Sequence, residues 1–153
     1  MEFDIQGNLK PYDIIYCDWS TLKTEFVDAF PESDTRPGIF RNYSEYLEKL
    51  IPIIGAGFHQ WIDGSFVTRK LNPRDIDVVT FVDANIYYAN ESEIDILRAY
   101  HRVRQTGVDE YFVKRYPENH QKYVFYHMDL LQWRSQFSTS RARKSKGFIQ
   151  LNF

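Results

Sequence analysis

The N-terminal third of the chain has the hydrophobic spacing of two helices. After Ser20, which we expect to cap the first helix, Leu22, Phe26 and Phe30 form one stripe that ends at Pro31. The second helix is predicted to have Pro37 in its first turn and to be ended by Pro52 with Gly55. Its apolar stripe consists of Ile39, Tyr43, Tyr46, Leu47 and Leu50. A stripe of this width packs one face of a helix against a core.

The rest of the chain switches repeatedly between strand and helix patterns. Strands are predicted at 58–62, 76–82 and 108–113, with a turn-rich connection over 63–74. A helix capped by Asn90 or Ser92 is expected to stop at Gly107, and its stripe is Ile96, Tyr100 and Val103. A later helical stripe is Tyr126, Leu130, Trp133 and Phe137, followed by a last apolar piece over 147–153. The alternation predicts an α+β (mixed α/β) domain with a small mixed sheet flanked by helices.

Length and composition limit the class of protein. The chain has 153 residues, 43% of them hydrophobic and 17% aromatic, which predicts one folded domain. We expect helical elements at about 20–52, a central core at about 58–113, and a basic helix and strand at about 124–153. No apolar run reaches the roughly 20 residues that a membrane helix needs. The acidic start and the single cysteine, Cys17, favour a cytoplasmic protein without internal disulfides.

Charge is unevenly distributed along the chain. The formal net charge is −2, which argues against a dedicated nucleic-acid coat protein. Residues 130–153 nevertheless contain no acidic residue, and they carry five basic residues: Arg134, Arg141, Arg143, Lys144 and Lys146. We call these five residues the cationic strip. We expect Arg141, Arg143, Lys144 and Lys146 to contact an anionic partner, either an acidic protein surface or RNA, with a solvated loop as the alternative.

The connection between the first two predicted strands carries the candidate chemistry. Gly64 and Ser65 follow an apolar strand, and after nine residues Asp75 and Asp77 enter a second apolar strand. Because strand side chains alternate, both carboxylates project from one face and lie about 7 Å apart along the chain. Two such charges repel by about 1 to 4 kcal/mol at a surface-like dielectric, and a divalent cation reverses the sign of that energy.

Oxygen ligands of this kind suit Mg²⁺ or Mn²⁺, and Mg²⁺ commonly completes its octahedron with substrate phosphates. Gly64 allows the backbone to approach a phosphate, while the Ser65 hydroxyl and the following N–H groups can donate hydrogen bonds to it. The residues therefore predict a site for a nucleoside triphosphate and its metal. Asp63 is read as a turn residue. Arg69, Lys70 and Arg74 either contact the triphosphate or are solvated loop cations.

This order of features resembles the signature of the nucleotidyltransferase superfamily with the polymerase-beta-type palm. Matches over nearly the whole chain extend the resemblance to a bacterial family of short nucleotidyltransferase-like proteins. They lie at 7–11, 62–68, 75–77, 108–113, 116–117, 133, 137 and 146–148. The resemblance implies transfer of a nucleoside monophosphate from a triphosphate such as ATP to a hydroxyl group.

The resemblance also implies residue roles. Asp75, Asp77 and a third carboxylate on the next strand hold the metal ions, and the third carboxylate takes the proton of the acceptor hydroxyl. Asp109 is the preferred third residue because it opens the strand predicted at 108–113, and Asp129 is the alternative. The triphosphate-binding residues are expected to be Gly64, Ser65, Thr68, Arg69 and Lys70.

The acceptor is the least defined part of this hypothesis. A chain this short has little material beyond the palm, so a protein or RNA acceptor must bind a surface. Small relatives in the superfamily occur as toxin or antitoxin components that modify a partner protein or tRNA, so the resemblance implies a toxin-antitoxin or defence context. The chain departs from the common antitoxin form, because Phe66, Val67 and Thr68 stand where that form has Arg and Gly. That departure puts transfer onto a toxin partner in doubt.

Other readings compete with catalysis. The main alternative is a catalytically silent module on the same fold that binds a nucleotide or a partner, and a third is an RNA-binding protein that grips phosphates with the cationic strip. For Gly64-Ser65 and the two Asp residues, the structural alternative is a plain turn followed by a solvated strand end. Charges that enter so apolar a strand are costly to bury, which favours a functional role. The four histidines share no ligand spacing. Trp133 and Phe137 are expected to be core residues rather than a base-stacking platform.

Overall fold

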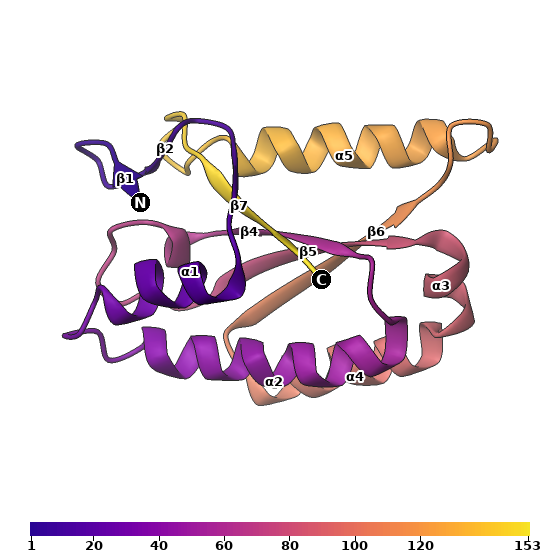
Figure 1. The fold of residues 1–153 in the computed structure, drawn as a ribbon, viewed down its shortest axis with the longest axis horizontal. Helices are drawn as coiled ribbons and strands as arrows, with labels where there is room; N and C mark the ends of the chain where they lie inside the picture. The colour runs from indigo at the N-terminus through magenta and orange to yellow at the C-terminus, as the bar shows by residue number, and fades with distance from the viewer.

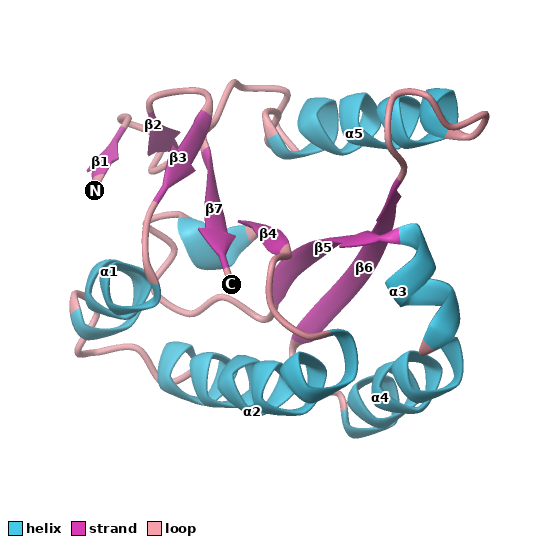
Figure 2. Ribbon diagram, turned by 45° about the vertical axis from the view of Figure 1, so that its right-hand side comes forward, coloured by secondary structure: helices cyan, strands magenta, loops and turns pink.

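The computed structural model describes residues 1–153 and confirms the predicted α+β class. A five-stranded mixed sheet has the order β3-β7-β4-β5-β6, and a separate two-stranded sheet pairs β1 with β2 (Figures 1 and 2). The strands are β1 (Glu2–Phe3), β2 (Leu9–Lys10), β3 (Ile14–Tyr16), β4 (His59–Asp63), β5 (Ile76–Asp83), β6 (Val108–Arg115) and β7 (Phe148–Asn152). The helices are α1 (Trp19–Lys23), α2 (Arg36–Ile54), α3 (Ala84–Ala89), α4 (Glu91–Arg104) and α5 (Tyr123–Phe137).

Helices cover both faces of the larger sheet. Figures 1 and 2 place α2 and α4 on one side and α5 on the other. Alternate residues of each strand therefore enter different cores: Ile62 and Val78 pack with the α2 side, whereas Trp61 and Val79 pack with Phe137 of α5. The predicted α5 stripe is confirmed, since Tyr126, Leu130 and Trp133 pack against the second core.

The first two helices differ from expectation at their ends. The N-cap of α1 is Asp18 rather than Ser20, because the Asp18 carboxylate accepts a 2.7 Å hydrogen bond from the backbone N–H of Thr21. A π-helical segment, Thr24–Asp28, continues α1. Pro52 lies inside α2 instead of ending it, in the last turn before Gly55, where the helix loses one N–H donor.

The prediction of the α4 stripe was wrong. Ile96 and Val103 are 72% and 81% exposed, while the buried positions are Ile94, Leu97 and His101. Both sets have helical spacing, and packing of His101 against Tyr46 of α2 selects the second. The short elements β1, β2, β3 and α3 were not predicted.

The order of strands brings distant segments together. β5 and β6 are parallel neighbours connected through α3 and α4, and β4 pairs antiparallel with both β5 and β7. The loop after α5 returns to the end of the sheet beside β1 and β2, where the N–H of Gly147 donates to the carbonyl of Leu9 (Figure 1). No helix has both the length and the apolar composition required to cross a membrane.

Candidate active site

Three aspartates occupy one row across neighbouring strands. The register pairs Asp63 of β4 with Asp77 of β5, and Asp77 with Asp109 of β6. Paired residues on neighbouring strands project from the same face, so the three side chains share the face that α5 covers. Asp75 lies immediately before β5, two residues from Asp77, and its charge raises the pKa of Asp77. We call Asp63, Asp77 and Asp109 the carboxylate row.

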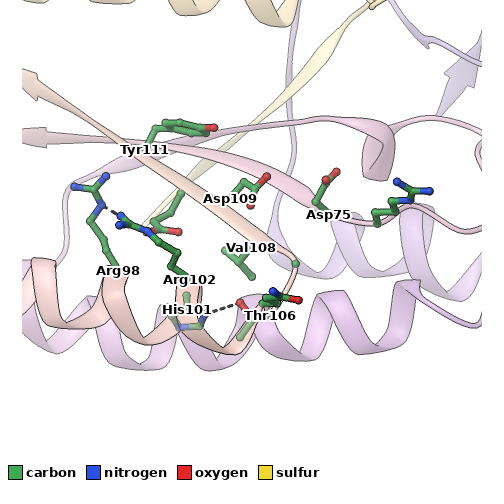
Figure 3. Close-up of a pocket in the computed structure, with 12 residues that line it drawn as sticks. Asp75, Arg98, His101, Arg102, Thr106, Val108, Asp109 and Tyr111 are labelled. Atoms are coloured by element: carbon green, nitrogen blue, oxygen red, sulfur yellow. Dashed lines mark hydrogen bonds and ion pairs between the residues drawn. The ribbon is translucent and has the colours of Figure 1, made fainter.

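The carboxylates perturb one another electrostatically. Burial raises the pKa of Asp77 to about 6, and the charges of Asp63, Asp75 and Asp109 add to the increase. Burial and the charge of Asp75 also raise the pKa of Asp109. In Figure 3 the side chains of Asp75 and Asp109 rise on the same side as Tyr111. The site is therefore a concentration of negative charge that a bound cation would relieve.

Asp63 is a buried residue at the end of β4, which corrects its interpretation as a turn residue. Its Oδ2 accepts a 2.6 Å hydrogen bond from Nζ of Lys146, while Oδ1 is buried without a hydrogen-bond partner. Burial raises the pKa of Asp63 to about 6, and the Lys146 charge opposes that rise.

Lys146 consequently does not belong to an exposed cationic strip. It is 7% exposed and lies between the loop after α5 and β7, where its backbone N–H donates to the carbonyl of Ser138. The expected contact of Lys146 with an anionic partner does not fit this position, because its charge is already neutralised by Asp63 inside the protein. Arg134 also has a partner, since its guanidinium donates to Asp13 at 2.9 Å. Arg141, Arg143 and Lys144 remain exposed and form what we call the basic loop.

Gly64 lies against the carboxylate row. Its φ of +83° is a conformation that side chains rarely adopt, and a Cβ at this position would lie 3.2 Å from Cγ of Asp77 and overlap its Oδ2. The glycine therefore permits the backbone to approach the Asp77 carboxylate. Ser65 follows it at the start of a short 3-10 segment, Ser65–Val67.

A buried arginine holds the loop that follows. The Arg36 guanidinium donates hydrogen bonds to the carbonyls of Phe66, Thr68 and Lys70 at 2.7, 2.8 and 2.6 Å. It also donates to the carbonyls of Leu71 and Phe26. No acidic residue pairs with Arg36, and burial lowers its pKa to about 10. Backbone carbonyls thus satisfy this cation and fix the course of the loop.

Three expected triphosphate ligands, Thr68, Arg69 and Lys70, line a second cavity. The Thr68 hydroxyl donates to the carbonyl of Ser65 and accepts from the N–H of Lys70. Arg69 contacts the Phe3 ring and Gly7, and all three residues of 68–70 line a separate cavity with residues 4–8. The structure therefore places Gly64 against Asp77 and joins Thr68 to Ser65, whereas Arg69 and Lys70 face a second cavity together with Thr68.

The two candidates for the third carboxylate are well separated by the fold. Asp109 stands beside Asp77 on β6, whereas Asp129 is an exposed residue of α5. Phe137 is a core residue, as expected, since it is 2% exposed and packs edge-on against Phe148. Trp133 is partly buried and packs against the same core.

A cavity of about 540 Å³ opens beside Asp75 and Asp109, between β6 and the C-terminal half of α4 (Figure 3). Arg74, Arg98 and Arg102 line it as well. Because β6 is the last strand of the sheet, this cavity lies along an edge that no other strand covers.

The residue chemistry fits a hard cation. Asp75, Asp77 and Asp109 offer only oxygen ligands, and Asp63 contributes a buried oxygen that lacks a partner. No three acidic, histidine or cysteine side chains gather closely enough to surround a cation without rearrangement. Without a cation between them, the negatively charged side chains repel one another, and this repulsion favours a wider spacing.

Sequence patterns alone missed Asp63, Lys146 and Arg36. The alternation of Trp61 and Asp63 along β4 was the available signal for Asp63. Nothing local marks Lys146 or Arg36, because their partners are 83 residues away for Lys146 and up to 35 for Arg36.

Comparison with known proteins gives a family but no characterised relative. No curated protein and no solved structure matches the chain significantly. One family model matches residues 1–152, nearly the full chain. The protein therefore belongs to DUF6932, a family of unknown function.

Proposed function

We propose that this protein is a metal-dependent nucleotidyltransferase, which moves a nucleoside monophosphate from a nucleoside triphosphate to a hydroxyl group of a protein or RNA acceptor. The observation that carries the proposal is the alignment of Asp77 with Asp109 on adjacent parallel strands, with Asp75 two residues before Asp77 and Gly64 against its carboxylate. Two strands that deliver carboxylates to one face suit the binding of a metal and a triphosphate together.

Asp75, Asp77 and Asp109 would hold Mg²⁺ or Mn²⁺. When bound, the ions neutralise charge on the phosphates and lower the pKa of the acceptor hydroxyl. The raised pKa values of Asp77 and Asp109 support this role. Burial and the neighbouring negative charges make the ionised forms of these carboxylates unfavourable, and a bound cation offsets that cost.

The side chains have distinct tasks in the proposed reaction. Asp109, on the side of the open cavity, accepts the proton of the acceptor hydroxyl. The hydroxyl oxygen forms a bond to the α-phosphorus, the bond from that phosphorus to the bridging oxygen breaks, and pyrophosphate leaves with the electron pair. Gly64 and Ser65 present backbone N–H groups and a hydroxyl to the phosphates. Arg36 acts only by fixing the loop after Ser65.

The test incubates purified protein with each radiolabelled nucleoside triphosphate, Mg²⁺ and cell extract. We expect one or more triphosphates to label a protein band or an RNA, with release of pyrophosphate, and the Asp77→Asn variant to label nothing. Binding of Mg²⁺ and triphosphate without transfer or pyrophosphate release would identify the silent binding module instead. If wild type binds no metal with any triphosphate, both the enzyme and that nucleotide-binding alternative are wrong.

A further inference from the structure

The cavity beside Asp109 has the lining of an anion-binding site. Of its twelve lining residues only two are hydrophobic, and three are arginines: Arg74, Arg98 and Arg102. Figure 3 shows Arg98 and Arg102 reaching from α4 toward β6, with Asp109 and Tyr111 across the opening. A largely polar cavity with several guanidinium groups suits a phosphate better than an apolar ligand.

The arginines are not equally neutralised. Arg98 lies 3.5 Å from Glu110 and 3.7 Å from Asp95, so both acidic residues compensate its charge. Arg74 and Arg102 form no ion pair with any acidic residue of the chain. Both Asp residues that line the cavity, Asp75 and Asp109, belong to the proposed metal site. A bound cation would therefore leave Arg74 without a compensating carboxylate and Arg102 with only the charge of Glu110, which Arg98 shares.

An aromatic side chain adjoins the same opening. Tyr111 lines the cavity and is 39% exposed, and one side of its ring packs at 4.7 Å between centroids on Trp133 of α5. It follows Asp109 by two residues on β6 and therefore projects from the same face. A partly exposed ring held by a second ring is a surface on which a nucleobase can stack.

The basic loop flanks the carboxylate row on its other side. Backbone hydrogen bonds between Ser140 and both Arg143 and Lys144 fold this loop into a tight turn. Two residues after Lys144, the bond from Lys146 to Asp63 fixes the loop to the β4 end of the row. The cavity, by contrast, lies at the β6 end of the row. Cationic surfaces thus lie on both sides of the aspartates.

We propose that the acceptor is single-stranded RNA, with phosphates of the strand bound by Arg74 and Arg102 in the cavity and by the basic loop on the opposite side. A polyanion contacts two separated cationic surfaces at once, whereas a single small phosphate occupies one. This inference deepens the proposed function and rests on it, since the hydroxyl that reacts at Asp109 would belong to the bound strand.

The test measures the anisotropy of a fluorescent single-stranded RNA of about 12 nucleotides as the protein is added, without triphosphate. We expect Arg102→Glu to weaken RNA binding by about fivefold or more, and the Arg141→Glu, Arg143→Glu, Lys144→Glu triple variant to weaken it further. Each lost phosphate contact should reduce the slope of log affinity against log salt concentration by about 0.7. Lys122→Glu, an exposed charge reversal at the opposite end of β6, is the matched control and should leave affinity unchanged.

Affinity for the triphosphate is measured on the same variants. Unchanged triphosphate binding with weakened RNA binding supports the inference. If Arg102→Glu weakens triphosphate binding and not RNA binding, the cavity holds the phosphates of the donor, and the inference is wrong. It is also wrong if Lys122→Glu weakens RNA binding as strongly as Arg102→Glu, because the attraction is then nonspecific.

Transfer assays separate this inference from the proposed function. RNA binding that depends on Arg102 and the basic loop, together with no nucleotide transfer, would remove the enzymatic proposal and leave a binding site for RNA. Transfer onto a protein by a wild type that does not bind RNA would overturn the RNA inference and leave nucleotidyl transfer in place.

Discussion

Nζ of Lys146 lies 2.6 Å from Oδ2 of Asp63, and both side chains are at least nine-tenths buried. The pair joins the segment before β7 to the end of β4 and places a positive charge beside the carboxylate row. A buried ion pair is held against a desolvation cost for both groups, so the loss of either partner leaves the other charge unpaired. The pair is therefore a structural element of the site and a sensitive point for mutation.

Replacing Lys146 by Met should destabilise the protein by about 3 to 5 kcal/mol at pH 8, because Asp63 would remain buried and charged. The pKa of Asp63 is already raised to about 6, and it would rise further without Lys146. The loss should therefore narrow as the pH falls through that higher value toward 6, because Asp63 of the variant then binds a proton while Asp63 of wild type is still charged. Thermal or urea unfolding from pH 5 to 8 measures it.

Two companion variants make the Lys146 measurement specific. Lys144→Met removes an exposed charge of the same kind and should change stability by less than about 0.5 kcal/mol. Adding Asp63→Asn to Lys146→Met removes the unpaired charge and should restore part of the lost stability. A Lys146→Met protein as stable as wild type at pH 8 would contradict the role assigned to the pair.

Asp77→Asn should abolish metal-dependent nucleotide transfer without weakening the fold. The pKa of Asp77 in the folded protein, about 6, exceeds its ordinary value of 3.8, so the folded state binds more protons between those pH values and wild-type stability declines as pH rises through that window. The Asn variant has no group that titrates at this position, so it does not show this decline in stability. At pH 8 and without metal we expect it to be more stable by about 1 to 3 kcal/mol.

Melting curves at pH 4 and 8, with and without Mg²⁺, check the Asp77 prediction. Mg²⁺ should raise the melting temperature of wild type, through preferential binding to the folded state, and should have little effect on Asp77→Asn. If the variant is less stable than wild type at pH 8 without metal, the Asp77 charge stabilises the folded protein, and the unfavourable burial and repulsion assigned to it are wrong.

Asp109→Asn should reduce nucleotide transfer by about 100-fold or more, since it removes both a metal ligand and the proposed proton acceptor. Asp129→Asn changes an exposed residue of α5 and should stay within a few-fold of wild type. Single-turnover rates of labelled nucleotide transfer give the comparison, with melting temperatures to establish that both variants fold. Equal activity of the two variants would remove Asp109 from the mechanism.

Gly64→Ala should destabilise the protein more than Gly55→Ala, although the two glycines have nearly the same backbone conformation. Gly64 has φ +83° and ψ −167°, and Gly55 has φ +74° and ψ −168°. Both variants incur backbone strain of about 1 to 3 kcal/mol. Only at Gly64 does the added Cβ meet the Asp77 carboxylate, since nothing lies within 4 Å of it at Gly55. Urea denaturation measures the difference, and equal losses would mean that the carboxylate moves aside freely.

Local properties of the sequence determined several parts of this protein. The proximity of Asp75 and Asp77 follows from their spacing at the entry of an apolar strand, and the long helix α2 follows from its apolar spacing together with Pro37 and Gly55. The Gly64-Ser65 pair was identifiable because it directly follows an apolar strand. In each case the decisive interactions lie within a few residues along the chain.

Only the tertiary structure decided which distant residues join Asp77. The pairing of β4 and β6 with β5 aligns Asp63 and Asp109 with it, and the return of the chain before β7 brings Lys146 to Asp63. Packing likewise selected Ile94, Leu97 and His101 of α4 over an equally regular stripe, and satisfied the Arg36 guanidinium with loop carbonyls. Strand order, register and helix rotation depend on burial summed over the whole core, so no local pattern of residues specifies them.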